Sequence, residues 1–303
     1  MNIQDDHGIS SLLVGTERRL CTGFGFTEGP IWVPADNALL FSDIPGNRTH
    51  RWRPGTTEAE VYREPSGWAN GMTLDADGNV IACEHGGRRV SHVRYGMPSE
   101  ATTLANHWGE HALNSPNDVV VHSSGAIFFT DPSYGVDSGR PVPFGAKGQT
   151  QDLKFQGVYR IDPDGTLNLV APEGFAQPNG LVFTPDESAI YIGDSGDKVI
   201  WRYPVQADLS LGERVLFVDQ RNDTRPGIPD GMKVDTDGRL WTTGAGGISV
   251  HTADGEYLGC FEMDEHAANL TFGGDGFGML FMTAATSVFA IQTTVRGIAP
   301  GSR

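Results

Sequence analysis

Six residues with side-chain oxygens recur along the chain, each at the start of a repeated motif, and their types suit the binding of a cation. In sequence order they are Glu28, Asn70, Asn117, Asn179, Asp230 and Asn269. Two are carboxylates and four are amides. Ca²⁺ and Mg²⁺ accept such oxygen donors, and a roomy site rich in carbonyl groups favours Ca²⁺. Zinc would favour His or Cys, and neither occurs at these positions.

Each of these residues opens the same local pattern. A short apolar run follows it, then a turn that contains Asp, Gly or Asn, then a second apolar run that ends in a small or acidic residue. An Asp-Gly pair between two apolar runs is a strong indication of a β-hairpin. Successive copies are 42, 47, 62, 51 and 39 residues apart. A period of roughly 40 to 50 residues is typical of the blades of a β-propeller.

The repeat therefore predicts an all-β chain that folds as a six-bladed β-propeller, with about four antiparallel strands per blade and a single domain over residues 1–303. The sixth copy runs out of sequence soon after Ile291, so we expect its outer strand to come from residues 18–22. That arrangement would close the ring and leave no exposed strand edge. A β-sandwich is the alternative, but six aligned copies of one hairpin argue against it.

In a propeller the first strand of each blade lies nearest to the axis, so the six residues should converge on one mouth of the central channel. Buried carboxylates without partners are unfavourable, and a hard cation would compensate them. The expected cation is Ca²⁺, with Mg²⁺, Mn²⁺ or Zn²⁺ as alternatives. A Ca²⁺ ion has about seven coordination positions, so four protein ligands would leave roughly three for water or substrate. The alternative is a structural metal that only joins the blades. The four predicted ligands are Glu28, Asn117, Asn179 and Asp230.

Seven longer motifs also stand out in the sequence. They lie at residues 26–32, 82–89, 113–119, 128–135, 157–161, 177–181 and 228–232. These motifs resemble those of the gluconolactonase/regucalcin family, also called the senescence marker protein family, and the resemblance extends from about residue 17 to residue 291. It implies a divalent metal bound by Glu28, Asn179 and Asp230, with Asn117 as a ligand or a substrate contact. It also implies hydrolysis of sugar lactones such as glucono-1,5-lactone.

Other functions stay open at this stage. The same oxygen donors resemble, more distantly, those of diisopropyl fluorophosphatase and the paraoxonases, so phosphotriesters or other lactones are alternative substrates. A propeller that binds a ligand or a protein, with a structural metal, is the non-catalytic alternative.

Metal-assisted hydrolysis needs a base that accepts a proton from the attacking water. Asp230 is the first candidate, because a carboxylate that binds the metal lies close to the reacting water, although it could equally be a ligand only. His85 is the second candidate, and its alternative role is that of a hydrogen-bonded residue at the rim. The predicted substrate contacts are Asn117, Asn70, Tyr134 and Arg88.

The third repeat is the longest, because residues 136–153, rich in Gly, Pro and Gln, follow its hairpin. Long loops at a channel mouth are often functional, so we expect this segment to cover the mouth and to influence substrate choice. Four acidic residues end the second apolar run of a repeat, and we expect them to bind backbone N–H groups. They are Asp43, Glu84, Asp131 and Asp194.

Composition argues against several partners. The formal net charge of −16 disfavours nucleic acids and anionic membranes, which bind cationic side chains. No stretch approaches the ~18 apolar residues of a membrane span, and the early apolar run at residues 12–14 is too short for a signal peptide, so we expect a cytoplasmic protein. The three cysteines lack a CxxC spacing and are expected to be buried thiols. The expected partner is a small lactone, and the oligomeric state is open.

Overall fold

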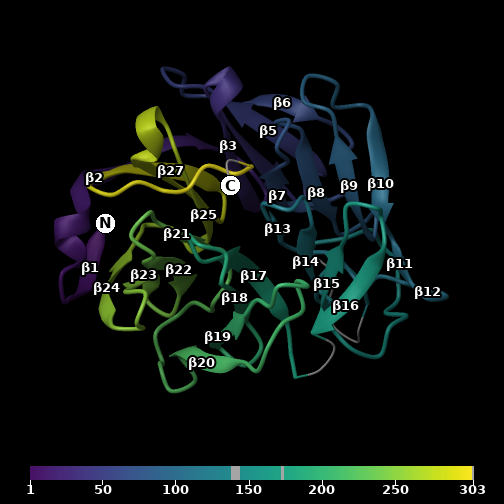
Figure 1. Ribbon diagram of the computed structural model, residues 1–303. Helices are drawn as coiled ribbons and strands as arrows, with labels where there is room; N and C mark the ends of the chain where they lie inside the picture. Colours follow the sequence, from purple (N-terminus) through teal and green to yellow (C-terminus); the bar gives the residue numbers. More distant parts are fainter. Residues whose placement is uncertain (138–143, 172–173, 302–303) are drawn as a thin grey trace.

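The computed structural model describes residues 1–137, 144–171 and 174–301. Six antiparallel sheets surround a common axis, which confirms the predicted six-bladed propeller (Figure 1). The innermost strands, in the order of blades 1 to 6, are β3 (Thr27–Val33), β7 (Ala69–Leu74), β13 (Val119–Val121), β17 (Pro178–Phe183), β21 (Met232–Val234) and β25 (Ala267–Gly273). The second strands are β4 (Ala38–Asp43), β8 (Val80–Glu84), β14 (Ile127–Asp131), β18 (Ala189–Asp194), β22 (Leu240–Gly244) and β26 (Met279–Ala284).

The outer half of each blade follows the same order. The third strands are β5 (Arg48–Trp52), β9 (Arg89–Val93), β15 (Gly157–Ile161), β19 (Val199–Pro204), β23 (Gly247–His251) and β27 (Ser287–Thr293). The fourth strands are β6 (Glu60–Arg63), β10 (Ala101–Ala105), β16 (Leu167–Ala171), β20 (Val215–Asp219), β24 (Tyr257–Glu262) and, in blade 6, β2 (Leu13–Thr22). The predicted four strands per blade are therefore confirmed.

The ring is closed by a strand from the N-terminal part of the chain, as predicted. Strand β2 pairs with β27, and Arg18 lies opposite Ala290 in the register. The sequence analysis did not anticipate β1 (Asn2–Asp6), which pairs with β24 and becomes a fifth strand of blade 5. The N-terminal segment therefore covers the outer edges of two neighbouring blades.

The hairpin turns form because acidic side chains bind the backbone of the turn. In blade 2, Asp75 Oδ1 accepts hydrogen bonds from the backbone N–H groups of Asp77 at 3.0 Å and Asn79 at 2.8 Å. Gly78 between them has a φ of 80°, which glycine adopts without steric cost. These local contacts explain why an Asp-Gly pair in the sequence predicts a hairpin turn.

Apolar side chains pack between neighbouring blades. The rings of Phe128 in blade 3 and Phe183 in blade 4 meet edge to face, with their centroids 5.2 Å apart, and both are almost completely buried.

The three cysteines are buried and free, as expected.

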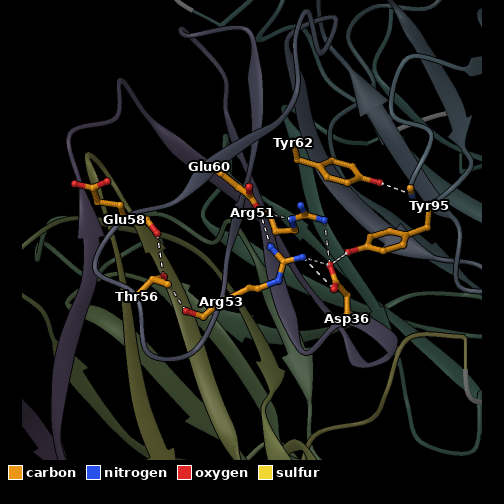
Figure 2. Close-up of polar contacts among 9 residues, drawn as sticks. Asp36, Arg51, Arg53, Thr56, Glu58, Glu60, Tyr62 and Tyr95 are labelled. Carbon is orange, nitrogen blue, oxygen red and sulfur yellow. Dashed lines mark hydrogen bonds and ion pairs between the residues drawn. The ribbon is translucent and has the colours of Figure 1, made fainter.

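A polar cluster also joins blades 1 and 2, at the end of the propeller opposite the starts of the innermost strands (Figure 2). Asp36 accepts hydrogen bonds from Arg53 at 2.8 Å, Arg51 at 3.1 Å and the Tyr95 hydroxyl at 2.5 Å. The rings of Tyr62 and Tyr95 stack at 5.6 Å. The ion pairs of this cluster lie within blade 1, and the Tyr95 hydroxyl and the tyrosine stack join it to blade 2.

Helical structure is minor. The short 3₁₀ helices are η1 (Ile9–Leu12), η2 (Pro34–Asp36) and η3 (Asp275–Phe277), and a small hairpin is formed by β11 (His107–Trp108) and β12 (His111–Ala112). Among the described residues, no helix is long and apolar enough to cross a membrane.

Candidate metal centre and active site

The six repeated oxygen-bearing residues, which we call the mouth residues, lie at irregular points of the innermost strands. They are Glu28, Asn70, Asn117, Asn179, Asp230 and Asn269. In blades 1, 2, 4 and 6 the pairing register with the second strand shifts at or beside the mouth residue, as in a β-bulge. In blades 3 and 5 the innermost strand begins two residues after it. The mouth residues are therefore not the first residues of regular strands. A bulge turns a side chain away from the regular alternation of a strand.

Backbone hydrogen bonds link the mouth residues of neighbouring blades. Gly71 N–H donates to Asn117 O at 2.7 Å, and Gly180 N–H donates to Asp230 O at 3.1 Å. The two backbones approach so closely that a Cβ atom on Gly71 would lie only 2.5 Å from Asn117 O. The glycine that follows a mouth residue thus allows the next blade to approach, and neighbouring mouth residues come side by side.

The ring of contacts is completed between blades 6 and 1. The side-chain amide of Asn269 donates to Glu28 Oε2 at 2.9 Å, although the two residues are 241 positions apart. Glu28 Oε2 also accepts a bond from Gly29 N–H at 2.7 Å. The Glu28 side chain is buried, and its pKa is raised to about 7: burial and the charge of Asp118 raise it, whereas the hydrogen bonds from Gly29 and Asn269 and the charge of Lys233 oppose the rise.

Asp230 shares the electrostatic environment of Glu28. The enclosed position of this carboxyl and the negative charges of Glu28 and Asp118 raise its pKa well above the usual range, while a hydrogen bond with Asn179 opposes the rise. The Asn179 amide nitrogen donates to Ser195 Oγ at 2.9 Å. Since its nitrogen faces Ser195, the Asn179 oxygen faces the other way and can serve as a ligand. Asp230 as a whole residue is half-buried, although its carboxyl group is enclosed.

Asp118 is a third carboxylate of this centre, and the sequence analysis missed it. It is buried, its Oδ1 accepts a bond from Val119 N–H at 2.9 Å, and its Oδ2 has no hydrogen-bond partner in the described part of the chain. Burial raises its pKa. A signal was present in the sequence: blades 1, 2, 4 and 5 have glycine after the mouth residue, whereas blade 3 has aspartate.

These residues fit a hard divalent cation. Buried carboxylates that raise one another's pKa gain stability from a nearby positive charge. Among the described residues, no group of three or more His, Cys, Asp or Glu side chains forms a metal site. The predicted donors combine two carboxylates with the amide oxygens of Asn117 and Asn179, a set that suits Ca²⁺ or Mg²⁺ better than zinc.

His85 lies in this region but is enclosed by its neighbours. Its Nδ1 is 2.9 Å from Phe144 O and its Nε2 is 3.2 Å from the side-chain nitrogen of Asn70. A carbonyl can only accept, so Nδ1 carries the proton and Nε2 accepts from Asn70. Burial lowers the pKa of His85 to about 4, which keeps the ring neutral at physiological pH.

The long loop of the third repeat reaches back to blades 1 and 2. Phe144 packs against Phe26 with ring centroids 5.0 Å apart, and Gln149 donates to Gly86 O at 2.9 Å. Val136 and Leu153, at its two ends, are buried. Residues 138–143 lie outside the described residues. The loop therefore contacts the mouth region, and its predicted influence on substrate choice stays a prediction.

The two other predicted substrate contacts differ in position. Tyr134 lies beside Asn179, Ser195 and Asp230, and its burial raises the pKa of its hydroxyl to about 12. The Arg88 guanidinium donates to backbone carbonyls of Leu113 at 2.6 Å and Ala112 at 3.3 Å. The structure thus brings Tyr134 to the predicted ligands, whereas the hydrogen bonds of Arg88 hold the segment that leads into blade 3.

Three of the four acids at the ends of second strands bind backbone N–H groups, as expected. Asp43, Asp131 and Asp194 each accept from the segment that precedes the mouth residue of their own blade. Glu84 differs, because it pairs with Arg63 at 2.9 Å and Arg89 at 2.7 Å. These acids therefore position the backbone around the site.

Asp131 allows a test of this positioning role through pH. Burial raises its pKa to about 7, above its usual value. The native state therefore holds a proton that the unfolded chain releases, and the free energy of unfolding should fall as pH rises from ~4 to ~7, on the order of 1 kcal/mol per pH unit. Asp131→Asn lacks this titration, so denaturation at several pH values should show a flatter profile. The exposed Asp77→Asn should retain the wild-type profile, and equal slopes for Asp131→Asn and wild type would contradict the assignment.

Comparison with known proteins places this site in a family. Residues 26–286 match the SMP-30/gluconolactonase/LRE-like region. The gluconolactonase of Zymomonas mobilis is 32% identical over 293 residues, which cover 90% of this chain and 80% of that protein. The pentonolactonase XacC of Haloferax volcanii is 30% identical over 265 residues, covering 85% and 81%. The structure of XC5397 from Xanthomonas campestris, a gluconolactonase, aligns with a TM-score of 0.84 and 31% identity, covering 96% and 94%. The chain belongs to the SMP-30/gluconolactonase/LRE-like family.

Proposed function

We propose that this protein is a divalent-metal-dependent hydrolase that opens sugar lactones such as glucono-1,5-lactone. The observation that carries the proposal is the convergence of Glu28, Asn179 and Asp230 on one end of the propeller axis, where burial and the charge of Asp118 raise the pKa of both carboxyls. Relatives named gluconolactonase and pentonolactonase support the substrate class. A cytoplasmic location stays a prediction.

Glu28, Asn117, Asn179 and Asp230 would hold the metal, and Ca²⁺ suits their oxygen atoms best. When bound, a dication polarises the lactone carbonyl and stabilises the negative charge that forms on its oxygen. Asp118 is close enough to influence Glu28 and Asp230 electrostatically, and its negative charge adds to the attraction for a cation.

Asp230 is proposed as the base. The residue as a whole is half-buried, and its carboxylate would accept a proton from water as the water oxygen attacks the lactone carbonyl carbon. The bond between that carbon and the ring oxygen then breaks, and the proton passes from Asp230 to the departing oxygen. The product is the open-chain hydroxy acid, with every atom of water retained.

His85 is better suited to orienting Asn70 than to moving protons. Its ring is neutral, and both nitrogens already have partners in Phe144 and Asn70. The Asn70 nitrogen faces His85, so its oxygen is directed away from the ring and can accept a hydrogen bond from a substrate hydroxyl. Tyr134 is proposed to line the same space.

The activity can be measured directly. Protein treated with EDTA is given Ca²⁺, Mg²⁺, Mn²⁺ or Zn²⁺, and acid release is followed with glucono-1,5-lactone, an aliphatic lactone and a phosphotriester. We expect metal-restored turnover that is fastest on the sugar lactone. Faster turnover of the phosphotriester would replace the proposed substrate class. Metal binding without hydrolysis of any compound would indicate a binding protein with a structural metal.

The long loop is expected to affect specificity more than stability. Asp137 N–H donates to Gln149 O at 2.7 Å and Gln151 N–H donates to Asp137 O at 3.1 Å, so the base of the loop is held together without its tip. Replacing residues 138–148 by a short Gly-Ser linker removes the Phe144 contacts but keeps this base. We expect a changed ranking of kcat/KM among lactones and a melting temperature within a few degrees of wild type. A large fall in melting temperature with an unchanged ranking would refute this role.

A further inference from the structure

A second cavity lies between the outer parts of blades 1 and 2, and its volume is about 730 Å³. Three charged residues on its wall belong together: Arg63 at the end of β6, Glu84 at the end of β8 and Arg89 at the start of β9. The lining includes none of the six mouth residues, all of which the structure describes. This cavity is therefore separate from the proposed metal centre.

Arg63 occupies a place in the repeat that is otherwise uncharged. In every blade the second residue of the third strand lies opposite one residue of the fourth strand, and in blade 1 that residue is Arg63. The corresponding residues of blades 2 to 6 are small or apolar and buried: Ala105, Ala171, Val218, Phe261 and Cys21. The Arg63 side chain is itself only 9% exposed. Burial of a guanidinium is unfavourable unless its charge and its N–H groups find partners, so the repeat gives no packing reason for arginine here.

The two arginines share a single carboxylate. Arg63 Nη2 donates to Glu84 Oε1 at 2.9 Å, and Arg89 Nε donates to Glu84 Oε2 at 2.7 Å. Glu64 also lines the cavity, but its carboxylate pairs with Arg48 at 2.9 Å. Two guanidinium groups against one carboxylate leave one excess positive charge on the cavity wall, in a protein whose formal net charge is −16.

The backbone holds this excess charge in place. A Cβ atom on Gly67 or on Gly87 would collide with Glu84 Oε2, so the two glycines enclose the carboxylate. Gly87 N–H donates to Gly67 O at 3.1 Å, which keeps the two segments together. Glu84 therefore stays with the two arginines, and the arrangement of charges is preorganised.

Hydrogen-bond donors on the cavity wall are not used by the protein. Among the described residues, Arg63 donates from its side chain only through Nη2, so the N–H groups of Nε and Nη1 are available. Asn47 Oδ1 accepts from Trp68 N–H at 2.8 Å, and the Asn47 amide nitrogen, on the other arm of the same group, has no acceptor in the described part of the chain. Both side chains line the cavity. Enclosed donors without acceptors favour a ligand that brings acceptor oxygens.

We propose that this cavity binds an oxyanion, the carboxylate or phosphate group of a small metabolite, through Arg63 and Asn47. Guanidinium groups bind both kinds of oxyanion through charge-assisted hydrogen bonds. The anion would cancel the excess positive charge, and its oxygens would accept from the donors that the protein leaves unused. The half-buried rings of Tyr62 and Trp68 on the same wall offer apolar surface to the rest of the molecule. The proposal does not depend on lactone hydrolysis or on the metal.

Calorimetric titration of the metal-free protein tests the proposal. The protein is treated with EDTA and dialysed, so that no anion can coordinate a metal at the mouth, and is titrated with inorganic phosphate, gluconate and the neutral polyol sorbitol. We expect phosphate or gluconate to bind and sorbitol not to bind. Tighter binding of phosphate would identify a phosphate group as the natural ligand, and tighter binding of gluconate would identify a hydroxy acid.

Two substitutions should change the affinity in opposite directions. Arg63→Leu removes the charged donor and should weaken binding by ~10- to 100-fold. Glu84→Gln keeps the volume and one acceptor oxygen but removes the negative charge, so it should strengthen binding roughly tenfold. Arg94→Leu, at an exposed position of blade 2 outside the cavity, is the matched control and should bind like wild type.

A further variant keeps the test decisive if Arg63→Leu does not fold. Thr103 is exposed, lines the cavity and accepts a hydrogen bond from Arg89 Nη1 at 2.9 Å. Thr103→Glu places a carboxylate beside the arginines, so it should fold normally and compete with the anion for the site. Absence of phosphate and gluconate binding in wild type, equal binding of sorbitol, or wild-type affinity in Thr103→Glu or in folded Arg63→Leu would overturn the proposal. Weaker binding by folded Glu84→Gln would also contradict it, because the excess charge would then not attract the ligand.

Discussion

Glu28→Gln is expected to lose metal affinity by at least ~10²-fold and, at limiting Ca²⁺, most of its lactone hydrolysis. Glutamine keeps an oxygen that can accept from Gly29 and Asn269, so the local hydrogen bonds survive. The negative charge is lost, and charge attraction over a direct contact is the strongest contribution to the binding of a hard cation. Calorimetric titration with Ca²⁺ and acid release from glucono-1,5-lactone measure the two effects.

The same substitution should leave the metal-free protein at least as stable as wild type at pH 8. Burial raises the pKa of Glu28 to about 7. A raised pKa stabilises the folded state at low pH, and this stabilisation is lost as pH rises through about 7, where the buried carboxylate must ionise. Glutamine has no such loss. Glu58→Gln, on an exposed segment of the same blade, is the matched control and should change neither affinity nor melting. Unchanged Ca²⁺ affinity in Glu28→Gln would show that the proposed centre is wrong.

Asp230→Asn is expected to lose catalytic rate even when the metal site is full. Asparagine keeps one coordinating oxygen and nearly the same volume, but it cannot accept a proton from water near neutral pH. Removal of a general base typically lowers the rate by about 10²- to 10⁴-fold. The experiment is a titration of kcat with Ca²⁺ for wild type and variant, with metal occupancy measured independently by calorimetry.

The titration gives a different result if Asp230 binds the metal but is not the base. If excess metal restores most of the rate of Asp230→Asn, the residue only binds the metal, and the proton acceptor must be sought elsewhere. His85 would be a poor substitute, because its pKa of about 4 and its two hydrogen bonds leave it little basicity. Asp254→Asn, exposed on the same blade, controls for an unspecific effect of the lost charge.

The predictions made from sequence succeeded where they depended on repetition. One hairpin pattern in six copies was enough to predict the blades, and the missing strand of blade 6 pointed to the N-terminal strand β2. Equivalence within the repeat also predicted that Glu28, Asn179 and Asp230 lie at the same end of the axis, and their roles there stay predictions. Repetition is informative because each blade forms from local turns and short-range strand pairing, which are encoded within about 50 residues.

Other features depend on contacts between blades, and no local pattern reports them. Strand β1 pairs with β24, which is more than 250 residues away in sequence. The backbone carbonyl of Phe144, on a loop of blade 3, accepts a hydrogen bond from Nδ1–H of His85 in blade 2, so that Nε2 can accept one from Asn70. The sequence identified His85 as a possible base, whereas its partners and its burial determine that the ring is neutral.

The charge state of the proposed metal centre also depends on contacts between blades. The residue types alone show carboxylates near a mouth, but the raised pKa of Glu28 results from burial and from Asp118 on another blade, whereas hydrogen bonds from Gly29 and Asn269 oppose the rise. The aspartate at position 118 is a visible departure from the repeat, yet its effect on Glu28 requires that both side chains reach the axis. Desolvation and Coulomb interactions depend on distances across the folded molecule, so the sequence specifies the groups and the assembled ring of blades specifies their energies.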